Sequence, residues 1–273
     1  MNEIQGLVSL ESIIRPTKDA IKAAETLGTD QIRFLVDAYY QMQDQRKTSS
    51  GQIRSIDQKV DQGEHATLDW LLAQQETMEN QIKRALDQYS QHHIAGPWLR
   101  NVYGIGPVIA AGLFAHIDIE KAPTVGHIWR FAGLDPTLKW EKKTKRPWNA
   151  QLKVLCWKIG ESFMKFHNRA ECYYGAVYKE RKEYEIARNE AMGNADAAAE
   201  GLLKIKDKKT EAFKAYSIGK IPPGQIDARA RRYAVKLFLS HLHEVWYTEH
   251  FGKPPPLPYP IAILGHAHIR PPQ

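Results

Sequence analysis

A short stretch after residue 102 combines residue types that suit the binding of a phosphate group. Gly104 and Gly106 flank Ile105, and Pro107 follows directly. Glycine adopts positive φ readily and proline is favoured at the first helical position, so the pattern predicts a tight turn that leads into a helix. Backbone N–H groups at such a helix start attract anions. The turn therefore predicts a phosphate contact, and the alternative is an ordinary connection between two helices that binds nothing.

A second candidate site is a basic loop that contains Trp140 and Trp148. Lysine and arginine neutralise phosphates and release counterions, and indole rings can stack on nucleic-acid bases. The alternative is that both indoles pack on the protein core while the lysines are merely solvated. The cationic residues of this candidate site are Lys139, Lys142, Lys143, Lys145, Arg146 and Lys153.

Three arginines, Arg229, Arg231 and Arg232, form a third candidate cluster at the start of the last predicted helix. Positive side chains at a helix N-terminus oppose the helix dipole unless an anion or a carboxylate lies nearby. The cluster therefore indicates either a phosphate contact or a salt bridge to Asp227.

Other chemistries find little support in the sequence. His241 and His243 point in different directions on a helix, and no Cys-x-x-Cys or His-Glu-x-x-His pattern occurs, so we expect neither a metal nor a cofactor. Cys156 and Cys172 are the only cysteines, which is too few for a disulfide framework. The sequence shows neither a signal peptide nor a membrane-spanning apolar run, so we expect a cytoplasmic protein without a membrane partner.

Charge is distributed unevenly along the 273 residues, whose net charge is +7. Residues 1–95 contain 10 lysines and arginines against 14 acidic residues, whereas residues 96–273 contain 28 against 17. The positive C-terminal part favours a polyanionic partner, with DNA expected before RNA.

Hydrophobic periodicity predicts a mainly α protein with an N-terminal helical arm over residues 1–95. Thr29 can cap one helix, the segment Thr48–Gly51 breaks it, and a second helix follows over residues 52–91. Its apolar stripe is narrow, which favours an antiparallel hairpin or a coiled coil. We therefore expect a homo-oligomer formed through residues 29–92, although a solvated arm without a partner is the alternative.

Residues 96–273 are predicted to form a basic, helical nucleic-acid-binding domain that contains a helix-hairpin-helix centred on the glycine turn. Its proline-rich tail, from residue 253, is expected to be extended. The further helices are expected over residues 97–103, 107–116, 124–133, 151–166, 170–203 and 228–250.

The glycine turn, Phe131–Pro136, Leu152-Lys153 and the helix Arg229–Val235 together resemble a known domain. From Leu99 to about Tyr247 the chain is similar to the C-terminal domain of the bridge-RNA-guided insertion-sequence transposases, which are recombinases. That family joins this domain to a RuvC-like N-terminal domain and uses a serine as nucleophile in a Ser-Lys-Arg-Gly-like loop.

At the family's serine position this chain has Thr144, and the loop continues Lys145-Arg146-Pro147. Nothing in residues 1–95 resembles the RuvC-like domain. The resemblance therefore implies DNA binding of a mobile-element or phage type, in a bacterial or phage-infected cell, without the recombinase chemistry. The alternatives are a transposase that uses Thr144, or less readily Ser162, with a partner that supplies acidic residues, and a non-enzymatic assembly protein that works through its helical arm.

Overall fold

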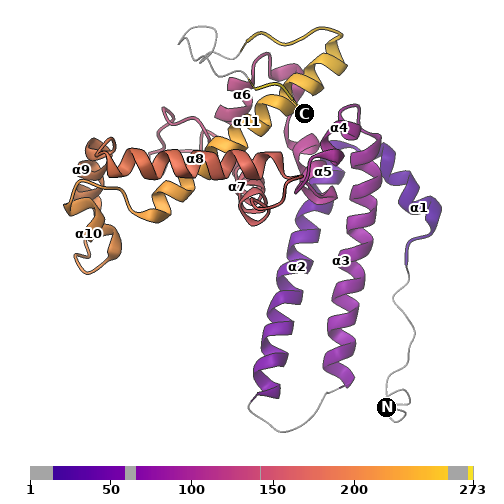
Figure 1. The fold of residues 1–273 in the computed structure, drawn as a ribbon. Helices are drawn as coiled ribbons and strands as arrows, with labels where there is room; N and C mark the ends of the chain where they lie inside the picture. The colour runs from indigo at the N-terminus through magenta and orange to yellow at the C-terminus, as the bar shows by residue number, and fades with distance from the viewer. Residues whose placement is uncertain (1–14, 59–65, 142, 258–269, 273) are drawn as a thin grey trace. The chain divides into compact units, whose positions relative to one another are not determined.

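The computed structural model describes residues 15–58, 66–141, 143–257 and 270–272, and all regular structure in these residues is helical (Figure 1). The mainly α class predicted from the sequence is thus confirmed. The chain divides into two compact units, which we describe separately. Unit 1 comprises residues 1–100 and 106–118, and unit 2 comprises residues 101–105 and 119–273. No helix in the described part of the chain is both long and apolar enough to cross a membrane.

Unit 1 is built on two long helices, α2 (Thr29–Asp57) and α3 (Ala66–His92), which pack along each other (Figure 1). The short helix α1 (Lys18–Lys22) and the 3-10 turn η2 (Ala23–Thr26) precede them, and α4 (Gly96–Asn101) follows. The core combines apolar residues of α2 and α3 with residues of α5 (Pro107–His116). Its buried members are Ile32, Val36, Tyr39, Leu86, Val108, Ala111 and Ala115.

The helix break predicted at Thr48–Gly51 is wrong, because α2 continues through it to Asp57. The low helix propensity of these four residues is outweighed by the cooperativity of a 29-residue helix whose earlier residues contact α3, as Arg46 does through its ion pair with Glu79. Gly28 precedes the first turn of α2 and donates its backbone N–H to the Gln31 side chain at 2.8 Å.

Helix α5 belongs to unit 1, so the observed division of the chain differs from the boundary predicted at residues 95 and 96. The helix begins at Pro107 and ends at His116, as the sequence predicts, and most of its residues are buried. A helix this apolar must bury nearly its whole circumference, and α2 and α3 supply that cover.

Unit 2 is organised around the long helix α11 (Pro223–Phe251), which packs on α7 (Ala150–Lys165) and α8 (Tyr173–Glu190) (Figure 1). Aromatic rings fill the space between them: the Phe163 ring lies 5.6 Å from that of Phe238 and 5.0 Å from that of Tyr174. The smaller elements are η3 (Ile119–Lys121), α6 (Val125–Phe131), α9 (Ala195–Lys204) and α10 (Glu211–Ser217).

The single helix predicted over residues 170–203 is wrong, because α8 ends at Glu190 and α9 begins at Ala195. The chain reverses between them through Met192, whose φ is +59°. The buried side chain of Asn189 stabilises the reversal by donating to the Ile221 carbonyl at 3.0 Å and accepting from the Ile221 N–H at 2.9 Å. Most of the predicted extended tail lies outside the described residues.

Candidate phosphate-binding pocket

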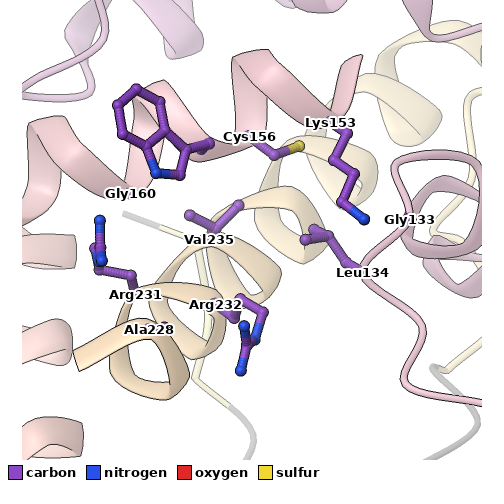
Figure 2. Close-up of a pocket in the computed structure, with 10 residues that line it drawn as sticks. Gly133, Leu134, Lys153, Cys156, Gly160, Ala228, Arg231, Arg232 and Val235 are labelled. Carbon is purple, nitrogen blue, oxygen red and sulfur yellow. The ribbon is translucent and has the colours of Figure 1, made fainter. Parts of the chain in front are cut away.

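A pocket of about 270 Å³ opens in unit 2 between α7, α11 and the segment Gly133-Leu134, which follows α6 (Figure 2). In this view Val235 lies near the middle of the pocket, Leu134 and Lys153 lie on the right, and the two arginines of α11 lie to the left and below. The pocket is therefore lined by residues of two predicted clusters, the basic loop with Lys153 and the arginines of α11, which are about eighty residues apart in the sequence. Its lining residues are Gly133, Leu134, Lys153, Cys156, Trp157, Gly160, Ala228, Arg231, Arg232 and Val235.

The start of α7 determines the position of Lys153. Asn149 caps this helix: its side-chain oxygen accepts the Leu152 N–H at 2.9 Å, while its own N–H donates to the Phe131 carbonyl at 2.8 Å. Lys153 lies in the first turn that follows, with its ammonium 4.0 Å from the centroid of the Trp148 ring. This cation–π contact is the only attractive interaction of the Lys153 ammonium with the described residues.

Electrostatics at Lys153 favour an anion. Burial, followed by the positive charges of Arg146 and Arg232, lowers the pKa of Lys153 below its ordinary value. A bound anion would reverse these effects, because it stabilises the charged form of the lysine. The Lys153 ammonium is therefore a positive charge that has no acidic partner among the described residues.

The three arginines of α11 have different environments. Arg229 pairs with the buried Glu185 at 3.4 Å and donates to Asn194 at 2.6 Å, so it supports the fold. Arg231 forms ion pairs with Glu161 and with Asp227, the latter at 2.8 Å, which is the salt bridge that the sequence offered as the alternative to a phosphate.

Arg232 is the arginine of this cluster that is available to a ligand. It forms no ion pair or hydrogen bond with any described residue, and its side chain is exposed. The part of the side chain that lies against the protein is desolvated, and this partial burial, followed by the charges of Arg229 and Arg231, lowers the pKa of Arg232. The structure thus brings Lys153 and Arg232 to one pocket, and both cations lack a carboxylate partner in the described part of the chain.

The basic loop before α7 is held by its two tryptophans. The Trp140 and Trp148 rings meet edge to face at 6.2 Å, and the Arg146 guanidinium lies 5.2 Å from the Trp140 ring. Trp140 also donates its indole N–H to the Thr144 carbonyl at 2.9 Å. This aromatic framework keeps exposed cations in the loop, namely Lys139, Lys143, Lys145 and Arg146, whereas Lys142 lies outside the described residues.

Thr144 lies at the exposed end of the same loop. Its hydroxyl donates to the Glu141 carbonyl at 2.8 Å, an arrangement typical of a turn. A nucleophilic hydroxyl needs a base that takes its proton, and a carbonyl oxygen cannot act as that base. Cys156, in the pocket wall, is equally unsuited to attack, because burial raises the pKa of its thiol to about 12.

The glycine turn is stabilised by contacts within the protein. Gly104 has φ +92°, and its carbonyl accepts the hydroxyl of Ser162 at 2.6 Å. The Ile105 N–H donates to the Val102 carbonyl at 3.0 Å, so the free amide that the sequence predicted is not found at Ile105. Gly106 precedes α5 and is partly exposed, and a phosphate contact there stays a prediction.

The pairing of Lys153 with Arg232 and the place of Trp157 in the pocket wall were not predicted. Trp157 lies four residues after Lys153, so the i, i+4 spacing could have placed the two on one helix face. Comparison with family models, with curated proteins and with solved structures finds no match to this chain, and the resemblance to the transposase family therefore stays a prediction.

Proposed function

We propose that unit 2 binds nucleic acid through backbone phosphates, largely without reading the base sequence. The observation that carries this proposal is the pocket in which Lys153 and Arg232 converge without carboxylate partners. Phosphate contacts position a protein on nucleic acid but carry no sequence information.

A polyanion explains the surroundings of the pocket better than a small anion does. The loop that carries Trp148 onto Lys153 also bears exposed cations, among them Lys145 and Arg146. Residues 96–273 as a whole contain 28 basic against 17 acidic residues. An isolated phosphate ion would use only the pocket, whereas a nucleic-acid strand can use the loop as well.

The finer parts of the proposal come from the resemblance to the insertion-sequence transposases. They are DNA as the preferred nucleic acid, a mobile-element or phage origin, and action in the cytoplasm. Because Thr144 has the environment of a turn residue, the proposal is binding without strand cleavage.

Fluorescence anisotropy with labelled oligonucleotides tests this function. Binding should weaken steeply as salt rises, with a log–log slope of about −0.9 for each phosphate neutralised on duplex DNA. Affinities for unrelated sequences should be similar. Absence of binding to any DNA or RNA at low salt would contradict the proposal.

A second candidate function is self-association through residues 29–92. Unit 1 exposes large apolar side chains on its long helices, namely Phe34, Trp70, Leu71 and Met78. Sedimentation velocity tests it directly: a dimer that becomes monomeric when Phe34 and Trp70 are replaced by serine supports self-association, and a wild-type monomer at all concentrations contradicts it.

A further inference from the structure

We infer that the pocket holds one unpaired nucleotide, with its base against Trp157 and its phosphate between Lys153 and Arg232. This inference rests on the proposed function and specifies its ligand. An aromatic wall, two cations without counter-charge and an apolar interior occur together in this pocket.

Trp157 is exposed in a way that core packing does not explain. Its side chain is 59 % exposed although it lines the pocket, whereas the neighbouring Cys156 is buried. Trp157 follows Lys153 by four residues, so the indole and the ammonium project from one face of α7. An aromatic surface next to a cation is the arrangement that proteins use to bind a base and its phosphate.

Helix α11 forms the opposite wall of the pocket, and its lining residues also lie on one helix face. Ala228, Arg232 and Val235 are spaced at i, i+4 and i+7 and therefore share one face of that helix. Ala228 is small enough to leave the pocket open, Val235 supplies apolar surface, and Arg232 supplies the charge. Gly160 allows the two helices to approach, since a Cβ there would lie 3.3 Å from that of Arg231.

The interior of the pocket is too apolar for inorganic phosphate alone. Leu134, Val235 and the neutral Cys156 line it together with Trp157. Apolar lining with a few polar groups is typical of sites for organic ligands, whose volumes run from about 300 to 1,000 Å³. A pocket of about 270 Å³ lies just below that range, which suits a single nucleotide rather than a longer segment.

This ligand implies a preference for single strands or unpaired ends. A base inside a duplex is stacked on both faces and is not available to an indole, whereas a base in a single strand is. The pocket should therefore contribute to binding of a single strand and contribute little to binding of the matching duplex.

The test compares a labelled single strand with the duplex of the same sequence. Trp157→Ala should weaken single-strand binding about 5- to 150-fold, the range expected for the loss of one stacked base, while duplex binding changes little. Trp157→Phe, which keeps an aromatic ring, should retain most of the affinity. Val154→Ala is the matched control, because Val154 is 51 % exposed on the same helix and does not line the pocket.

Two outcomes overturn the inference without affecting the proposed function. They are wild-type binding that Trp157→Ala leaves unchanged, and an equal loss for single strand and duplex. Failure of the wild type to bind any oligonucleotide would instead contradict the proposed function. Circular dichroism should show unchanged helicity in every variant, and Arg232→Gln offers a second route to the same single-strand loss if Trp157→Ala does not fold.

Discussion

Gly133 and Trp148 are in such close contact that a Cβ on Gly133 would lie 2.9 Å from Cγ of the Trp148 indole. The same Cβ would lie 3.1 Å from Cδ of Lys153. Gly133 also has φ +65°, a conformation that other residues adopt at a cost. Glycine at this position therefore allows the segment after α6 to pack against the indole that supports Lys153.

Replacement of Gly133 by alanine should lower stability and weaken nucleic-acid binding together. We expect a loss of about 1–2 kcal/mol in the free energy of unfolding from the left-handed backbone alone. Displacement of Trp148 adds to this loss and moves Lys153. Urea denaturation and anisotropy measure the two effects, and wild-type values for both would contradict the described packing.

At Gly51, in contrast to Gly133, replacement by alanine should stabilise the fold. Gly51 lies inside α2, and nothing lies within 4 Å of the position its Cβ would take. Gly51→Ala should therefore raise the free energy of unfolding by about 0.5–1 kcal/mol, because alanine loses less backbone entropy in a helix. A destabilised variant would indicate that the helix does break at Thr48–Gly51.

Stability should also fall in mild acid because of His116. Burial, assisted by the positive charge of Arg33, lowers the pKa of this histidine from 6.5 to about 4. Between these two values the unfolded chain takes up a proton that the folded chain refuses, so stability decreases as pH falls through the window and levels off below it. The total loss is on the order of 3 kcal/mol.

His116→Gln isolates this effect. The variant cannot titrate at this position, so its free energy of unfolding should decrease less between pH 7 and mild acid than that of the wild type. Burial also lowers the pKa values of His241 and His243. Both histidines are present in the wild type and in the variant, so their contributions to the pH dependence of stability cancel in the comparison. Identical pH profiles would show that the pKa of His116 is the same in the folded and unfolded chain, which contradicts the effect of burial.

Much of the fold could be predicted from local patterns. Proline at the first position and a continuous apolar run gave α5 its observed bounds, and apolar periodicity located α7 closely. The failures arose where packing outweighs propensity. The Thr48–Gly51 segment remains helical because it continues a long helix whose earlier residues pack on α3. The reversal at Met192 depends on the buried Asn189, whose partner Ile221 is distant in sequence.

The candidate site was only partly accessible from the sequence. Basic composition identified Lys153 and Arg232 separately, but their meeting in one pocket depends on how α7 crosses α11. Arg229 and Arg231 looked equivalent to Arg232 in sequence, and their acidic partners Glu185 and Glu161 are far away in the chain. Salt bridges to such distant partners follow from tertiary structure, whereas the pair of Arg231 with Asp227, four residues earlier, could be expected from the sequence.

The most direct test of the central claim removes both available cations of the pocket. Lys153→Gln combined with Arg232→Gln should weaken binding of a labelled single strand regardless of its sequence and reduce the magnitude of the salt slope by about 1.4, which is about 0.7 for each lost phosphate contact on a single strand. The control is Lys206→Gln combined with Lys208→Gln, which removes the same charge from exposed positions outside the pocket. Equal affinities and slopes for the two double variants would contradict the account, and a loss confined to the pocket variant would support it.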